Sequence, residues 1–285
     1  MKRRALLSLP LAAALTSLEA ARARAGEALR ARTVSDSRLI ERFRFHAGAA
    51  LLAPAGAGSD GSICIGTADG YVHLLGPDGS FRWSHSVRGA ITRRPIRVGQ
   101  LWLLATSAER VYALTPDGTL YWVFRPPSPV ASELAADATG IAYFVGADHF
   151  LYGVTAHGGV SLRAAFGLLK AGPSAGPDGA VWAENQAGDR IRVRGQELRR
   201  APAESTPEFD FGSSEALVDS EGHEWRARAD GVLEFRAAVG SEPSRIELTS
   251  APLFAPSWLA ATHCALISAR DGLVVALAAR DPQGQ

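Results

Sequence analysis

One stretch decides the fold: residues 62–83, which read SICIGTADGYVHLLGPDGSFRW. This stretch predicts three short β-strands: an apolar run, an Asp-Gly turn, a second apolar run, a Pro-Asp-Gly turn and a third strand that ends on Trp83. Asp-Gly and Pro-Asp-Gly favour turns because glycine adopts positive φ without steric penalty and proline pre-sets the turn backbone. The stretch therefore predicts an antiparallel meander.

The same pattern recurs along the chain. Residues 101–122 repeat it as LWLLATSAERVYALTPDGTLYW, and further copies span residues 141–159, 181–193, 216–225 and 265–277. The turns at Asp69, Glu109 and Asp148 are about 40 residues apart, the length of a four-stranded propeller blade. Five such steps separate Asp69 from Asp271. The sequence therefore predicts an all-β fold, a β-propeller of about six four-stranded blades.

Segments that precede the repeats predict the innermost strands. A proline stands before five of the repeats, and Glu133-Leu134 takes its place in the third; the prolines are Pro54, Pro95, Pro173, Pro207 and Pro252. Proline cannot donate to a strand ladder, so it favours an unpaired edge such as the one facing a central channel. Continuous apolar runs, as in residues 101–105, predict blades covered on both faces by their neighbours. A two-layer sandwich, the alternative, favours cleaner alternation and lacks the 40-residue period.

The last repeat ends after its third strand, and the N-terminal side supplies a candidate fourth. Residues 42–46, RFRFH, precede the first inner strand, and Phe45 stands as far before Ile63 as Trp83 stands before Leu101. We therefore expect the N-terminal strand to complete the last blade and remove its open edge.

The N-terminus has the features of an export signal. Lys2, Arg3 and Arg4 precede an apolar stretch over residues 5–18, and small-x-small cleavage patterns follow at residues 21–25. We expect a signal peptide at 1–25, a linker at 26–37, the propeller at 38–281 and a tail at 282–285. The paired arginines also resemble a twin-arginine signal, but a plain basic n-region explains the same residues and is favoured. The alternative to an export signal is an Ala/Arg-rich amphipathic helix. The expected location is the periplasm or outside the cell.

The charge of the chain excludes two classes of partner, nucleic acid and anionic membranes. Without residues 1–25 the chain has 25 basic and 28 acidic side chains. A net charge of about −3 does not give the excess of basic side chains that binding to nucleic acid or to an anionic membrane requires. We expect a monomer with no transmembrane segment after signal cleavage, whose partner is another periplasmic or secreted protein.

Residues 65–83, IGTADGYVHLLGPDGSFRW, resemble the PQQ-like repeat of the quinoprotein alcohol dehydrogenase-like propellers. The resemblance covers roughly residues 38–281. That superfamily includes quinone-dependent dehydrogenases and also non-enzymatic relatives, such as the assembly lipoprotein of the outer-membrane β-barrel machinery. The resemblance therefore implies the fold and leaves function open.

Several features depart from the enzymes and from that lipoprotein, both of which have eight blades. The enzymes often have an adjacent Cys-Cys pair, whereas Cys64 and Cys264 are 200 residues apart here. Their register places both thiols on the same face of their blades, which predicts two buried thiols rather than a disulfide. Glu184, Asn185 and Asp189 come nearest to a calcium set but stand at a blade turn. We predict no catalytic residue, no metal site and no cofactor; PQQ with calcium belongs to the enzyme alternative.

The mouth of the channel is the expected site, because the inner strands of all blades converge there. Arg93, Arg94, Arg97 and Lys170 make one arc of this ring basic, and Glu133 stands beside them. We expect this arc to attract an acidic ligand or partner segment; the alternative is solvated charge. The leading interpretation is an exported, non-enzymatic propeller that serves as a protein-interaction scaffold. The alternatives are a quinone-dependent (PQQ) oxidoreductase or a degenerate relative, and a carbohydrate-binding propeller.

Overall fold

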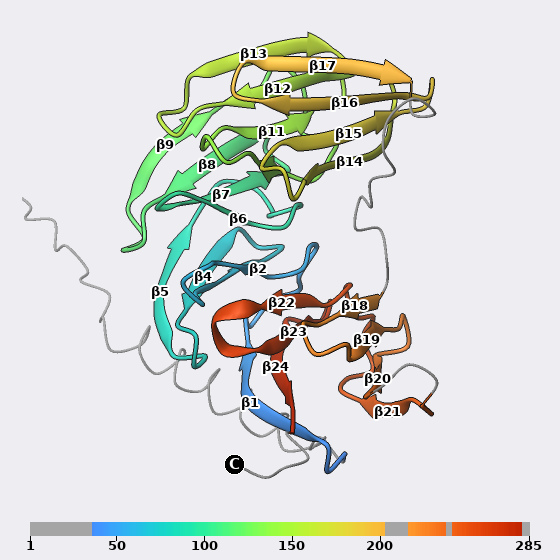
Figure 1. The fold of residues 1–285 in the computed structure, drawn as a ribbon. Coiled ribbons are helices and arrows are strands. Elements are labelled where there is room, and N and C mark those ends of the chain that lie inside the picture. Colours follow the sequence, from blue (N-terminus) through green and yellow to red (C-terminus); the bar gives the residue numbers. More distant parts are fainter. Residues whose placement is uncertain (1–35, 203–215, 238–240, 281–285) are drawn as a thin grey trace, which may run out of the picture. The chain divides into compact units, whose positions relative to one another are not determined.

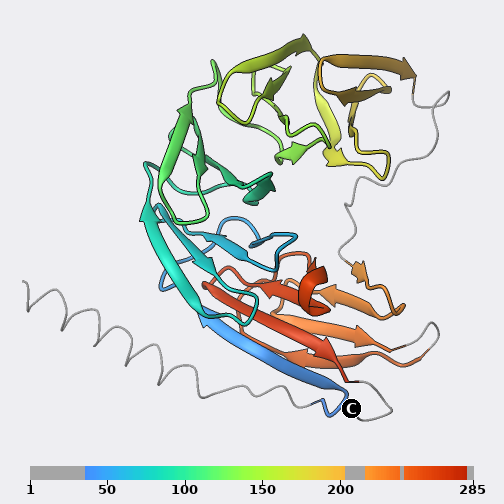
Figure 2. The ribbon, with the colours of Figure 1, turned by 60° about the vertical axis from the view of Figure 1, so that its left-hand side comes forward.

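The computed structural model describes residues 36–202, 216–237 and 241–280. The signal peptide and tail expected at 1–25 and 282–285 lie outside these residues, as does most of the linker expected at 26–37. The described residues form six four-stranded antiparallel sheets, each a blade of a β-propeller (Figures 1 and 2). The predicted fold class is confirmed.

Blades are numbered along the chain, and each is given from its innermost strand outward. Blade 1 consists of β2 (Gly56–Ala57), β3 (Ile63–Gly66), β4 (Tyr71–Leu75) and β5 (Phe81–Ser86). Blade 2 consists of β6 (Ile96–Val98), β7 (Leu101–Thr106), β8 (Arg110–Leu114) and β9 (Leu120–Phe124). Blade 3 consists of β10 (Ala135–Ala136), β11 (Ala142–Val145), β12 (Phe150–Val154) and β13 (Val160–Ala165).

The second half of the chain forms the other three blades. Blade 4 consists of β14 (Leu169–Ala175), β15 (Val181–Asn185), β16 (Asp189–Arg194) and β17 (Glu197–Pro202). Blade 5 consists of β18 (Ala216–Val218), β19 (Glu224–Ala227), β20 (Val232–Arg236) and β21 (Ser244–Glu247). Blade 6 consists of β22 (Ser257–Leu259), β23 (Cys264–Ser268), β24 (Leu273–Ala279) and β1 (Leu39–His46), with the 3-10 helix η3 (Ala260–Thr262) after β22.

The tight turn between the second and third strands is the same in every blade, although its sequence varies. One residue of each turn has positive φ: Gly70, Glu109, His149, Gly188, Gly231 and Gly272. This common backbone explains how Glu109 and His149 occupy a place where glycine is favoured. The fifth copy is one strand out of register: residues 216–225 cover β18 and β19, and the equivalent turn is Asp230-Gly231.

The N-terminal strand closes the last blade as predicted. β1 pairs antiparallel with β24, and Phe45 stands opposite Val274. Figures 1 and 2 show the blue β1 beside the red β24. A register shift between Glu41 and Phe43 marks a bulge in β1. This pairing covers the outer edge of β24.

Prolines locate most of the inner strands, with one correction. Pro95 directly precedes β6, and Pro173 lies within β14. Pro207 lies outside the described residues. Pro252 was the wrong marker for blade 6, because Pro256 directly precedes β22 and it is Pro256 that lines the channel. The error arose because two prolines stand within five residues of each other.

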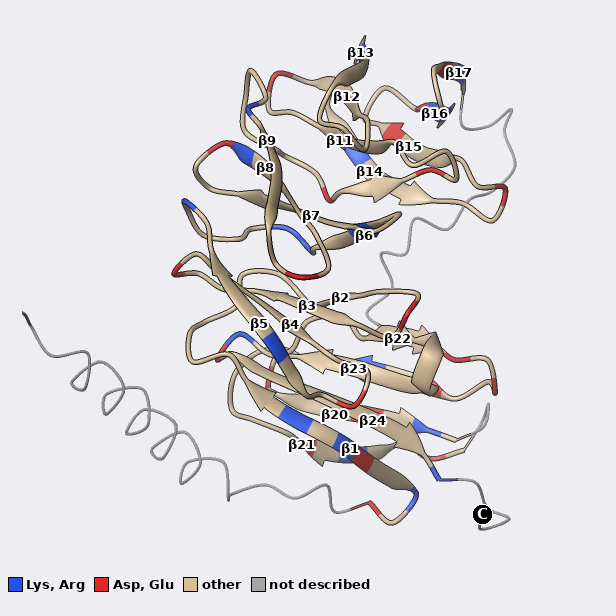
Figure 3. Cartoon of the chain, turned by 90° about the vertical axis from the view of Figure 1, so that its left-hand side faces the viewer, with Lys and Arg blue, Asp and Glu red and all other residues tan. Residues whose placement is uncertain are grey.

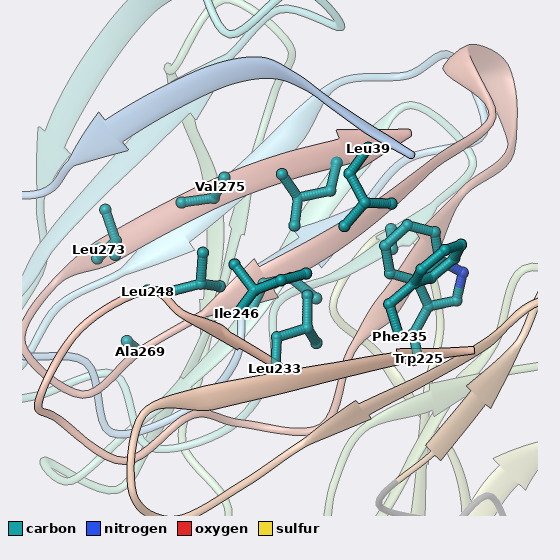
Figure 4. Close-up of a cluster of buried hydrophobic side chains, with 12 residues drawn as sticks. Leu39, Trp225, Leu233, Phe235, Ile246, Leu248, Ala269, Leu273 and Val275 are labelled. Atoms are coloured by element: carbon teal, nitrogen blue, oxygen red, sulfur yellow. The ribbon is translucent and has the colours of Figure 1, made fainter. Parts of the chain in front are cut away.

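Apolar clusters join consecutive blades. The cluster between blades 5 and 6 contains Trp225 and Phe235, whose ring centroids are 4.6 Å apart (Figure 4). Comparable clusters join blades 6 and 1, 1 and 2, 2 and 3, and 3 and 4. Cys64 and Cys264 are buried in two of these clusters and form no disulfide, as expected.

The expectation that every blade is apolar on both faces is wrong for blades 4 and 5. In β15 and β16, Val181 and Ile191 are buried toward blade 3, while the intervening Trp182 and Arg192 lie on the opposite face and are only half-buried. β19 and β20 alternate in the same way around Trp225 and Phe235. Such alternation is the pattern of a sheet with one dry and one wet face.

His73, at the interface between blades 6 and 1, makes the fold sensitive to acid. Its ring lies 5.9 Å from that of Phe45 and 6.4 Å from that of Phe81. Its ring nitrogens are buried and have no hydrogen-bond partner among the described residues. Burial lowers the pKa of His73 below its ordinary 6.5, against the opposing charge of Asp69.

Acidification should therefore destabilise the protein through His73. As pH falls below 6.5 the unfolded chain takes up the proton first, so the free energy of unfolding decreases, by at most about 1.4 kcal/mol per pH unit for one group. At higher pH both states are neutral and the group contributes no pH dependence. Urea unfolding at pH 7.5 and 5.5 should show a larger loss in the wild type than in His73→Phe. Equal losses in the two proteins would exclude this role for His73.

Candidate functional site at the channel mouth

The inner strands and the segments before them line a cavity of about 820 Å³. All six blades contribute to its wall, through Ala57, Ile96, Ala135, Ser174, Leu217 and Ser257 among others. Its volume is in the range of pockets that bind small ligands or short peptide segments. The channel is thus the convergence point that the inner-strand prolines predicted.

Arg94 and Glu133, two of the candidate residues, both line this cavity. The Glu133 carboxylate (Oε2) accepts a hydrogen bond from the backbone N–H of Arg94 at 3.0 Å. The guanidinium of Arg94 donates no hydrogen bond to any described residue. Burial lowers the pKa of Arg94, and the nearby Glu133 charge opposes that shift. Arg94 therefore offers a charged, planar donor to whatever enters the channel.

Arg97 also lines the cavity, but the protein already uses its guanidinium. Nη1 lies 3.4 Å from the carboxylate of Asp60, and Nη2 donates to Oε1 of Gln100 at 3.0 Å. The guanidinium carbon lies 5.6 Å from the centroid of the buried Trp102 ring. Arg97 thus shapes the positive wall beside Arg94 while its own donors are partly satisfied.

Arg93 does not line the channel. Its guanidinium donates to the carbonyl oxygens of three consecutive residues at the entrance to blade 3, namely Val130, Ala131 and Ser132, at 3.3, 3.1 and 2.9 Å. The chain bends at Arg93, two residues before Pro95, and of this segment only Arg94 and the residues after it line the cavity. Arg93 therefore links blade 2 to blade 3 and is separated from the site.

Lys170 is likewise outside the cavity wall. Its ammonium group binds Oε1 of Glu184 at 2.5 Å, while Arg190 binds Oε2 of the same carboxylate at 2.9 Å. The hydrogen bond from Lys170 has the largest effect in lowering the pKa of Glu184, and the one from Arg190 lowers it further. Of the predicted residues, the structure brings Arg94, Arg97 and Glu133 together at the channel and assigns Arg93 and Lys170 to structural pairings.

Trp258 is a residue of the cavity that the predicted set omitted. It lies on β22, half-buried, with its ring centroid 6.3 Å from that of His263 in an edge-on arrangement. The sequence carried a signal for it, because Trp258 does not fall where the outer-strand tryptophans Trp83 and Trp122 fall in their repeats. The channel therefore combines an arginine, a carboxylate and an aromatic face.

The groups nearest to a calcium set do not fit that role. Both oxygens of Glu184 are bound by cations, which would compete with a metal ion. Asn185 caps its own turn: its amide donates to the Phe166 carbonyl and to Asp189, and its oxygen accepts the Asp189 backbone N–H. Among the described residues, no three His, Cys, Asp or Glu side chains cluster as metal ligands do. No step through quinone and calcium is derived from this set.

No helix in residues 36–202, 216–237 and 241–280 combines the length and apolarity that a membrane span requires.

Comparisons with known proteins support the fold. No protein-family model matches the sequence, and no curated protein matches it. Among solved structures, the chain is similar to BamB from Moraxella catarrhalis, with 14% identity and a TM-score of 0.51 over 90% of this chain and 94% of that chain. It is also similar to an inactive virginiamycin B lyase from Staphylococcus aureus with quinupristin, with 10% identity and a TM-score of 0.46 over 79% of each chain.

At these identities the likeness concerns the fold alone. The chain has a β-propeller fold similar to that of BamB, and the fold that the resemblance of residues 65–83 implied is confirmed.

Proposed function

We propose that this protein is an exported, non-enzymatic propeller that binds an acidic segment of another periplasmic or secreted protein at its channel mouth. The observation that carries the proposal is the guanidinium of Arg94, which lines the cavity without a hydrogen-bond partner among the described residues. The partly buried setting strengthens a charge-assisted hydrogen bond to a carboxylate. A rigid ring of blades that presents such a group suits a scaffold.

Export is the second part of the proposal and rests on residues 1–25. Their basic start, apolar stretch and small-x-small pattern are those of a cleaved signal. Sequencing the N-terminus of the protein recovered from the cell envelope tests this part.

Binding of an acidic peptide tests the role of Arg94. A fluorescently labelled octaglutamate peptide should bind the wild type at low salt, and Arg94→Gln should weaken that binding about tenfold or more, since a hydrogen bond to a charged group contributes about 1.5–3 kcal/mol. Fluorescence anisotropy gives the dissociation constants. Lys170→Gln is the matched control, because Lys170 has a similar charge but pairs with Glu184 outside the cavity wall; its effect should stay within twofold.

Two outcomes would contradict the proposal. Equal weakening by Arg94→Gln and Lys170→Gln would mean that the peptide responds to overall charge rather than to the channel. No weakening by Arg94→Gln would remove Arg94 from the site. Addition of quinone and calcium tests the enzyme alternative separately: a bound chromophore with alcohol-dependent dye reduction would favour it. A glycan array tests the carbohydrate alternative.

A further inference from the structure

Blade 4 carries a charged sheet face. Trp182 and Glu184 of β15, with Arg190 and Arg192 of β16, lie on the side opposite the buried residues that pack on blade 3. Arg190 binds Glu184, and Nε of Arg192 lies 2.6 Å from the carboxylate of Asp178. The guanidinium of Arg192 also lies 6.0 Å from the Trp182 ring centroid. Figure 3 marks a red segment on β15 and a blue one beside β14.

Blade 5 carries a charged face of the same kind. Glu224, Arg226, Glu234 and Arg236 lie on the side opposite Trp225, Leu233 and Phe235, which pack on blade 6. Four ion pairs cover this face: Arg226 and Arg236 bind Glu224 at 3.1 and 2.7 Å, and Arg228 and Arg245 bind Glu234 at 3.2 Å each. Ion pairs thus occupy the place that an apolar cluster takes elsewhere.

These two faces lie at the two ends of the series of packed blades. Apolar clusters join the blades in the series 4, 3, 2, 1, 6 and 5. In the described ranges, no apolar cluster combines residues of blades 4 and 5. The inner strands of both blades nevertheless line the same channel, through Ser174 of β14 and Leu217 of β18. In the described ranges, five pairs of neighbouring blades are therefore joined by apolar clusters, and blades 4 and 5 are not.

The charges of the two blades are complementary. Residues 169–202, which contain blade 4, have six basic and four acidic side chains. Residues 216–247, which contain blade 5, have four basic and seven acidic side chains. Opposite net charge favours association of the two faces and fixes their orientation without apolar burial.

We propose that blades 4 and 5 meet in a hydrated ionic seam that opens when salt screens it and gives access to the channel from the side. The four ion pairs of blade 5 and the Arg192–Asp178 pair of blade 4 are half-exposed, so they weaken as the screening length falls from about 10 Å at 0.1 M salt to about 3 Å at 1 M. The nearly buried Arg190–Glu184 pair is screened less. Apolar clusters are not weakened by salt in this way. The seam is consequently the boundary of the ring that opens first.

Cysteine labelling tests the seam without removing any of its charges. Val232 of β20 shares the charged face of blade 5, because it alternates with the inward Leu233. The Val232→Cys thiol should react with the neutral reagent N-ethylmaleimide about tenfold faster in 1 M than in 20 mM KCl. Two matched valine variants serve as controls: Val160→Cys, where the side chain is 53% exposed, and Val111→Cys, within the cluster between blades 2 and 3. The native thiols of Cys64 and Cys264 are buried and provide the background.

We expect the rate at Val160→Cys to change less than twofold and the thiol of Val111→Cys to stay protected at both salt concentrations. The proposal fails if Val232→Cys reacts as fast as Val160→Cys at both salt concentrations. The charged faces of blades 4 and 5 are then each solvated and do not meet. It also fails if the thiol of Val232→Cys stays as protected as that of Val111→Cys. If the protection seen at low salt disappears when the protein is diluted, the contact forms between two copies of the chain. That result would overturn closure within one ring.

Hydrogen exchange of the unmodified protein gives a second readout. Amides of β15, β16, β19 and β20 should lose protection several-fold in 1 M KCl, while those of β7 and β8 in blade 2 should not. Loss of protection in all six blades alike would indicate general destabilisation and contradict a local seam.

Discussion

Trp225→Ala should lower the free energy of unfolding by about 3–5 kcal/mol, the range for removing a large buried aromatic side chain. Trp225 is completely buried in the cluster between blades 5 and 6, where its ring packs on Phe235. Its indole N–H also donates to the buried Asp219 carboxylate at 3.0 Å, so the variant leaves both a cavity and a carboxylate short of one donor. This loss is a large part of the 5–15 kcal/mol that stabilises a typical domain.

Trp182→Ala is the matched control, since Trp182 occupies the corresponding position on the second strand of blade 4 but lies half-buried on the charged face. We expect the control to lose less than half as much as Trp225→Ala. Urea unfolding followed by circular dichroism measures both, because tryptophan fluorescence changes with the substitution itself. Equal losses would contradict the assignment of one dry and one wet face to blades 4 and 5.

Gly56→Ala should destabilise the protein by about 3 kcal/mol, at the upper end for overpacking, because the clash is with backbone. A Cβ atom on Gly56 would lie 2.0 Å from the Pro95 carbonyl oxygen and 3.1 Å from the Trp102 ring. β2 of blade 1 and the start of blade 2 would have to separate at the channel wall. Because Arg94 precedes Pro95, binding of the acidic peptide should weaken as well.

Gly159→Ala is the control for this variant. Its φ is not positive, and an added Cβ would make only an ordinary contact, 3.5 Å from the Thr155 hydroxyl oxygen. The unfolding free energy should stay within about 0.5 kcal/mol of the wild type. Thermal unfolding of the two variants tests the pair, and a Gly56→Ala protein as stable as Gly159→Ala would show that the inner strands are not closely packed.

The repeat made the fold predictable, whereas the site depended on details of register. Three clear copies of the repeat were sufficient to predict the blades. The position of Phe45 was sufficient to predict that β1 completes the last blade. Arg93 and Arg94 are neighbours in sequence, and the local bend of the backbone at Arg93 decides which of them reaches the channel. Lys170 meets Glu184 at the first of two register shifts in the pairing of β14 with β15, and bulges of this kind have no reliable sequence pattern.

The charged faces of blades 4 and 5 could have been predicted. The sequences VWAEN and DRIRVR in blade 4, and EWRA and VLEFR in blade 5, alternate apolar and polar residues, unlike LWLLAT in blade 2. The period of about 40 residues nevertheless favoured the inference that all blades are buried in the same way. That inference concealed the charged faces of blades 4 and 5. The repeat predicts the topology of the blades. The alternation of apolar and polar residues within one copy predicts whether each face of that blade is buried or solvated.

The pairing of β1 with β24 has a consequence for folding. Leu39 and Ala279 are partners although 240 residues separate them, and closing so long a loop costs about 5 kcal/mol of chain entropy. Blade 6 cannot form its full sheet until β24 has been synthesised, so β1 remains unpaired until then. Two strands that lie far apart in the chain thus depend on each other, and deletion of either β1 or β24 should disrupt the same blade.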